Sequence, residues 1–116
     1  MSRIQKGRFA EKLAQNYLLK KGYKILKSNY RTRESEIDLI CISPDGILCF
    51  VEVRSGITFN PVESVNLKKV QKIIKGALSF VSEINWDGDI RFDVIVVHLK
   101  HDNPIIQHII AAFEET

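Results

Sequence analysis

Apolar side chains recur every three or four residues at the start of the chain, which is the spacing of a helix that buries one face. They are Ile4, Phe9, Ala10, Leu13, Ala14, Tyr17 and Leu18. Gly22 follows as a natural stop, so the pattern predicts a helix over residues 3–21. Its one acidic residue, Glu11, lies at the margin of the apolar stripe.

The next segments are rich in β-branched and aromatic residues, a composition typical of strands. They read YKILKSNY (23–30), SEIDLICIS (35–43) and ILCFVEVR (47–54). The turn signal Pro44-Asp45-Gly46 joins the last two segments and predicts a β-hairpin.

The second half of the chain predicts a helix over residues 64–83 and a buried strand over 90–99. The helix carries a basic stripe of Lys68, Lys72 and Lys75 beside its apolar one. Arg91 and Asp93 stand two residues apart on the strand, which predicts a structural ion pair. Residues 105–113 are typical of either an edge strand or a short helix. The order α-β-β-β-α-β, with this extra C-terminal segment, indicates an α/β or α+β domain with a mixed sheet.

Composition is that of an ordinary globular protein, with 45% hydrophobic and 27% charged residues among 116. This length predicts a single domain over residues 1–116. No apolar run reaches the roughly 18 residues of a membrane span, and the N-terminus lacks the apolar stretch of a signal peptide. We therefore expect a cytoplasmic protein without membrane contact, and the sequence leaves open whether it forms a homodimer.

Charge is distributed unevenly around the net value of +3. Residues 1–33 hold ten basic residues and one acid, which gives +9 there and −6 in the remainder. This asymmetry is typical of a surface for a polyanion, and Arg8, Arg31 and Arg33 are our candidates for nucleic-acid contacts. The alternative is a solvated helix face with a few exposed lysines.

The predicted hairpin brings four charged side chains together. If it turns about Asp45, facing residues have numbers that add to 90, so that Asp38 faces Glu52 and Glu36 faces Arg54. Strand alternation puts all four on one face of an otherwise apolar sheet. Arg54 neutralises one charge, which leaves Asp38 and Glu52 as an oxygen-rich site for a hard divalent ion such as Mg²⁺ or Mn²⁺. The alternative is a salt-bridge network at the end of the sheet.

Several motifs, in order and over nearly the whole chain, resemble the YraN-like family of uncharacterised predicted nucleases. They are GRFAEKLAQNYLLKKGYKIL, SNYRTR, SEIDLI, FVEVR, VNLKKVQKI and RFDVIVV. That family is similar to archaeal Holliday junction resolvases and shares their restriction-endonuclease-like PD-(D/E)xK fold. The resemblance implies a restriction-endonuclease-like α/β core and a Mg²⁺- or Mn²⁺-dependent endonuclease that acts on nucleic acid, with DNA as the expected substrate.

The resemblance also implies roles for individual residues. Asp38 and Glu52 match the acidic motif positions that hold the metal, and Val53 would offer its backbone carbonyl. Glu11 matches a helical glutamate that completes the site in the resolvases. Arg54 stands where related nucleases place a lysine.

Some positions depart from the family pattern. Ser35 replaces a glycine, Gly56 replaces a second basic residue, and Arg54 stays protonated where a lysine could deprotonate a water molecule. Lys69 aligns with a family lysine and predicts a phosphate contact, with a solvated position as the alternative.

Three functions remain open from the sequence. The leading hypothesis is a metal-dependent endonuclease in which Arg54 stabilises the pentavalent phosphate while Glu11 or Glu36 assists the metal or orients water. The second is a catalytically silent nucleic-acid-binding module on the same fold, which Arg54 favours. The third is a protein-interaction domain in which the acidic cluster is structural.

Overall fold

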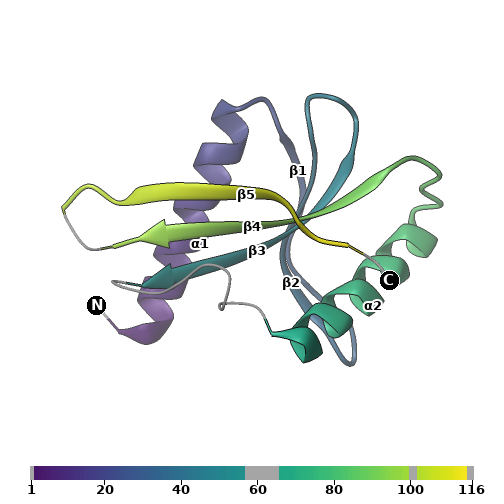
Figure 1. Cartoon of the computed structure of the whole chain (residues 1–116), viewed down its shortest axis with the longest axis horizontal. Coiled ribbons are helices and arrows are strands. Elements are labelled where there is room, and N and C mark those ends of the chain that lie inside the picture. Colours follow the sequence, from purple (N-terminus) through teal and green to yellow (C-terminus); the bar gives the residue numbers. More distant parts are fainter. Residues whose placement is uncertain (1, 57–65, 100–101, 115–116) are drawn as a thin grey trace.

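The computed structural model describes residues 2–56, 66–99 and 102–114. Its elements follow the predicted order (Figure 1), and the C-terminal segment is a strand. They are α1 (Arg3–Lys20), β1 (Lys24–Arg31), β2 (Glu36–Ile42), β3 (Leu48–Gly56), α2 (Leu67–Glu83), β4 (Ile90–His98) and β5 (Ile105–Phe113). Residues 64 and 65, which the helix prediction includes, lie outside the described residues. Neither helix of the described ranges is long and apolar enough to cross a membrane.

The strands form one mixed sheet in the order β1-β2-β3-β4-β5. The pairs are antiparallel except for β3 and β4, which are parallel and are joined through α2. The two helices cover opposite faces of this sheet, since their buried residues belong to different core clusters. Ala10, Ala14 and Leu18 of α1 pack on one face, while Ile73 and Phe80 of α2 pack on the other. The α/β prediction with a mixed sheet between helices is confirmed.

A buried polar network ties α1 to the two C-terminal strands. Asp93 is fully buried and accepts hydrogen bonds from the Arg91 guanidinium at 2.9 Å and from His108 Nε2 at 2.8 Å. His108 Nδ1 lies 3.1 Å from the Tyr17 hydroxyl of α1. Burial alone would raise the pKa of Asp93, but the hydrogen bonds from His108 and Arg91 hold it below its usual value. The predicted Arg91–Asp93 ion pair is confirmed as part of this network.

The β2–β3 hairpin has the predicted register over its regular part. The pairs run from Ile42 with Leu48 to Leu39 with Val51, and each sums to 90. Beyond Leu39, however, β2 pairs only with β1 among the described ladders. The end of the hairpin therefore diverges from β3, and this divergence begins at Asp38.

A bend in the neighbouring strand accompanies this divergence. Asn29 of β1 lies beside Asp38 in the register and has a φ of 52°, a left-handed conformation that asparagine tolerates better than most residues. On β2 the alternation of side chains is interrupted, because Ile37 and Ile40 both belong to the cluster under α2. Asp38 is consequently placed at a corner of the sheet, where side chains from both faces can approach it.

A glycine allows α2 to approach β2 closely. A Cβ atom on Gly76 would lie 2.6 Å from Ser35 Oγ and 3.2 Å from Ile37 Cδ1. Real Cβ atoms do not come so close to a neighbour, so any larger residue would push the helix away from the strand. Gly76 thus sets the distance between α2 and the start of β2.

We expect Gly76→Ala to destabilise the protein by about 1–2 kcal/mol, since overpacking outweighs the better helix propensity of alanine. Gly7→Ala is the matched control, because Gly7 also lies within a helix but has no atom within 4 Å of an added Cβ. It should stabilise the protein by about 0.5–1 kcal/mol. Urea denaturation measures both changes, and a stabilised Gly76→Ala protein would contradict the close packing.

Candidate metal and nucleic-acid site

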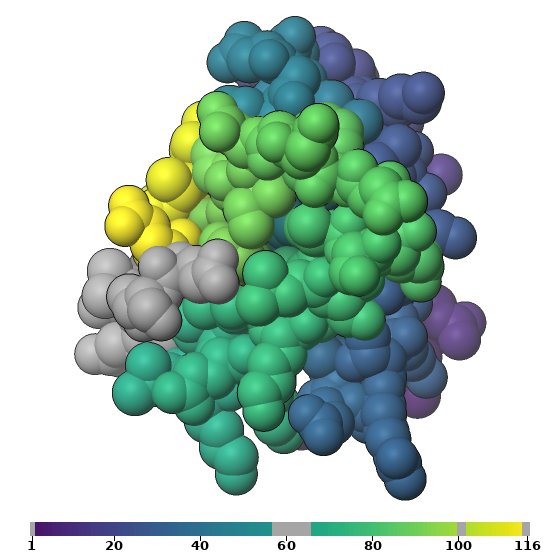
Figure 2. Space-filling view, turned by 90° about the vertical axis from the view of Figure 1, so that its right-hand side faces the viewer, coloured from purple at the N-terminus to yellow at the C-terminus, as the bar shows by residue number. Residues whose placement is uncertain are grey.

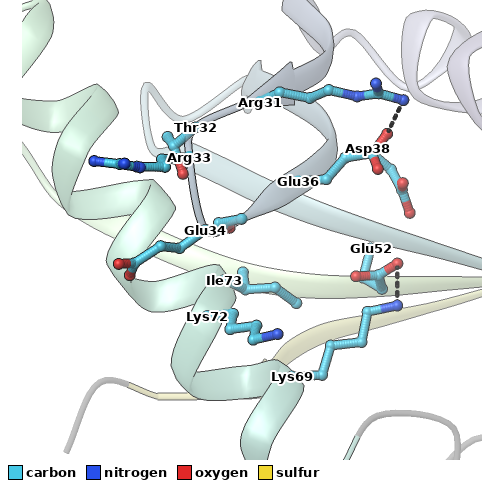
Figure 3. Close-up of a pocket in the computed structure, with 11 residues that line it drawn as sticks. Arg31, Thr32, Arg33, Glu34, Glu36, Asp38, Glu52, Lys69, Lys72 and Ile73 are labelled. Atoms are coloured by element: carbon cyan, nitrogen blue, oxygen red, sulfur yellow. Dashed lines mark hydrogen bonds and ion pairs between the residues drawn. The ribbon is translucent and has the colours of Figure 1, made fainter.

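The acidic side chains of β2 and β3 line a pocket of about 510 Å³ between the β1–β2 turn and α2 (Figure 3). Its acidic residues are Glu34, Glu36, Asp38 and Glu52. Its basic residues are Arg31, Arg33, Lys69 and Lys72. The pocket therefore contains the carboxylates that the register prediction brings together. It also contains cations from β1, the β1–β2 turn and α2.

Asp38 is held by the divergence of the hairpin. Its Oδ2 accepts a hydrogen bond of 2.7 Å from the backbone N–H of Val53, in place of a backbone carbonyl of β2. The ladder between β2 and β3 has ended by this point, so the side chain occupies the space between the two strands. Asp38 is thus held by a hydrogen bond from β3 at the point where the β2–β3 ladder ends.

Glu52 is a buried carboxylate of this pocket whose charge is only partly compensated. Its side chain is 5% exposed, and its Oε1 lies 3.3 Å from Lys69 Nζ. Its Oε2 is buried and has no hydrogen-bond partner among the described residues. Burial and the neighbouring Asp38 raise the pKa of Glu52 to about 8, although Lys69 and Arg54 pull it down. Two ionised carboxylates repel each other, so a proton or a further cation would stabilise the pair.

The predicted pair of Glu36 with Arg54 is wrong. Glu36 instead forms an ion pair of 3.3 Å with Arg31, which faces it across the β1–β2 ladder. The cause is the divergence of the hairpin, which carries Glu36 along β1 and away from β3. Arg54 remains beside Glu52 on β3, and its Nε is buried without a hydrogen-bond partner in the described part of the chain.

Glu11 approaches the same carboxylates from α1. Burial and the charge of Asp38 raise its pKa, and a hydrogen bond from the Asn29 side chain partly offsets this. Glu11 also lines a second pocket of about 490 Å³ with Arg8, Asn29 and Arg31. Asn29 was not predicted for the site, and only the tolerance of asparagine for left-handed turns could have indicated it.

The basic side chains predicted for nucleic acid lie along these pockets. Arg31 lines both the acidic pocket and the Glu11 pocket. Arg33 lines the acidic pocket and a third pocket of about 670 Å³, which also contains Lys68, Lys72 and Lys75 of α2. Figure 2 shows this side of the molecule, where a notch separates the surface of α2 from that of the β1–β2 turn. Lys69 is 35% exposed but is not simply solvated, since its ammonium pairs with Glu52.

The donor set fits one hard divalent cation. Asp38 and Glu52 supply carboxylate oxygens, one of them buried and unpaired. Within the described ranges no three His, Cys, Asp or Glu side chains are grouped closely enough to enclose a metal. Mg²⁺ needs no such cage, because it keeps several waters and binds through one or two carboxylates together with substrate phosphate.

Comparison with known proteins places this chain in a family. The pattern of the "Uncharacterised protein family UPF0102" matches residues 10–97. The chain belongs to UPF0102. A UPF0102 protein of Clostridioides difficile is 49% identical over 97% of this chain and 100% of its own length. Another, from Sulfurihydrogenibium, is 45% identical over 84% of this chain and 87% of its own. The resemblance to the YraN-like family is thereby confirmed.

Among solved structures, this UPF0102 chain is similar to Pyrococcus furiosus SfsA in complex with Ca²⁺. The match has a TM-score of 0.36 and 14% identity, and it covers 91% of this chain and 62% of that one. A superposition this distant adds nothing to the description of the site.

The raised pKa of Glu52 predicts how stability depends on pH without metal. The ordinary value is 4.5 and the folded value is about 8, so between them the folded state binds more protons than the unfolded state. Stability should therefore fall as pH rises through this interval, by roughly 5 °C or more in melting temperature. Thermal melts in a chelating buffer across the interval measure it.

Asp38→Asn should flatten this slope, because it removes the charge that opposes ionisation of Glu52 and keeps an oxygen for the Val53 N–H. Glu34→Gln is the control, since Glu34 is 67% exposed and should leave the slope unchanged. An equal slope in the natural and Asp38→Asn proteins would show that the two carboxylates do not interact.

Proposed function

We propose that this protein is a divalent-metal-dependent nuclease that hydrolyses phosphodiester bonds in nucleic acid, with DNA as the expected substrate. One observation carries this proposal: the buried Glu52, next to the half-buried Asp38, has one carboxylate oxygen without a hydrogen-bond partner among the described residues, in a pocket that arginine and lysine side chains also line. A pocket with such a free carboxylate oxygen and with cations around it suits a metal ion and a phosphate together.

Asp38 and Glu52 would hold Mg²⁺ or Mn²⁺. When bound, the ion would supply an acidified water and polarise the phosphate. The N–H of Val53 keeps Asp38 in place. Since the N–H and C=O of a strand residue point toward the same neighbouring strand, the Val53 carbonyl also faces the side of Asp38, which supports its role as a further ligand.

The surrounding charges have distinct roles in this proposal. Arg54 is a permanent cation beside Glu52 and would stabilise the charge that develops on the phosphate. Glu11 interacts with Asp38 from the other face of the sheet and would accept hydrogen bonds from water at the site. Glu36 is occupied by Arg31, so its contribution would be to orient that arginine toward the pocket.

The arrangement of basic residues supports a polynucleotide rather than a small phosphate ester. Arg31 and Arg33 each line two pockets, so cations continue on both sides of the carboxylates. Arg8 extends the row along α1. Contacts of this kind position a phosphate backbone without reading its sequence.

A second candidate is a nucleic-acid-binding module without catalysis. The observation that favours it is Arg54, because an arginine cannot deprotonate a nucleophilic water as the lysine of related nucleases can. Arg54→Lys separates the candidates: in a nuclease it should equal or exceed the natural protein in metal-dependent cleavage. If neither protein cleaves while both bind nucleic acid equally, the module is the correct function.

We expect Mn²⁺ or Mg²⁺ to stabilise the protein, by about 2.7 kcal/mol at a hundred times the dissociation constant. Asp38→Asn should abolish this stabilisation and also the cleavage of a panel of single-stranded, duplex, flap and four-way-junction substrates. Melting curves and gel assays measure the two effects. Glu34→Gln, in the same pocket but largely exposed, should retain both. An Asp38→Asn protein that is still stabilised by metal would refute the site.

A further inference from the structure

Lys69 occupies an unusual position for a cation. Its Nζ lies 3.3 Å from Glu52, whose side chain is 5% exposed, while the lysine itself is 35% exposed and lines the acidic pocket (Figure 3). It therefore enters the pocket from solvent and ends on the buried carboxylate. The ammonium supplies part of the positive charge that the carboxylate pair lacks.

The start of α2 holds the backbone of Lys69 firmly. Asn66 caps the helix and accepts a hydrogen bond of 2.9 Å from the Lys69 N–H. A lysine in the first turn faces the positive end of the helix dipole, and no acidic residue of that turn compensates it. Helix stability does not explain the lysine there. Its ion pair with Glu52 does.

We propose that Lys69 is a displaceable countercharge. In the free protein it neutralises Glu52. In the working site Glu52 would hold the divalent cation instead, and the released Lys69 ammonium would bind a substrate phosphate. This inference rests on the proposed function and makes Lys69 a substrate-binding residue whose phosphate contact depends on whether Glu52 holds it.

The pocket provides room for both positions. Lys69 lies on the same helix as Lys72, one turn away, and the pocket that both line also contains Arg31 and Arg33. A lysine side chain has a flexible stem of four carbons, so its charge can move while its backbone stays fixed. A substrate phosphate bound by Arg31 and Arg33 would therefore lie in the same pocket as the released Lys69 ammonium.

Release of Lys69 can be tested without any metal. Glu52→Gln removes the charge that holds the lysine, so Lys69 should bind phosphate even in a chelating buffer. We compare the effect of Lys69→Met on the affinity for a short DNA duplex in three backgrounds: the natural protein, Glu52→Gln and Asp38→Asn. The third background also loses one negative charge but keeps the Lys69–Glu52 pair.

We expect Lys69→Met to weaken binding by less than about twofold in the natural and Asp38→Asn proteins, and by about five- to tenfold in the Glu52→Gln protein, as one phosphate contact is worth. The matched control is Lys72→Met, since Lys72 lies in the same pocket and forms no ion pair in the described part of the chain. It should weaken binding equally in all three backgrounds.

Two results would overturn the inference. If Lys69→Met costs the same in all backgrounds, Lys69 is a fixed contact or a fixed structural ion and not a displaceable one, while the nuclease proposal stands. If no protein of the series binds DNA, the proposed function fails and this inference fails with it. Glu52→Met replaces Glu52→Gln if the latter melts at a lower temperature than the natural protein, so the comparison remains decisive.

Discussion

The carboxylates of Asp38 and Glu52 lie together at a corner of the sheet, where burial and the neighbouring Asp38 raise the pKa of Glu52 above its usual value. Burying a charged group costs free energy, and a single salt bridge does not necessarily offset that cost. Lys69 and Arg54 supply part of the compensation, but one oxygen of Glu52 has no partner among the residues that the structure describes. In the proposed function, this local deficit is where a divalent cation would bind.

The surrounding fold serves to maintain this deficit. The left-handed turn at Asn29 and the end of the β2–β3 ladder bring Asp38 out of the regular sheet. Gly76 lets α2 approach the start of β2 closely, and Lys69 of the same helix reaches Glu52. On the far face, the network around Asp93 has the same kind of buried carboxylate, yet there Arg91 and His108 satisfy it completely. The contrast shows that this sheet can bury a fully compensated acid and does not do so at Glu52.

Much of this could be predicted from the sequence, because it depends on local patterns. The helices, the strands and the register of the hairpin follow from apolar periodicity and from the turn at Asp45. The pairing of Glu36 could not be predicted, because a register extrapolated along β2 does not contain the divergence after Leu39. The ion pair of Lys69 with Glu52 was missed for another reason: it joins elements far apart in the chain, and its distance depends on how closely α2 packs.

The most direct test of the charge deficit is a crystal structure of the natural protein soaked in Mn²⁺, with anomalous scattering recorded at the manganese edge. We expect one anomalous peak in contact with carboxylate oxygens of both Asp38 and Glu52, and the Lys69 ammonium moved away from Glu52 toward Arg31 and Arg33. A map without a peak at these carboxylates, in which Lys69 still contacts Glu52, would contradict the assignment of this pair as a metal site.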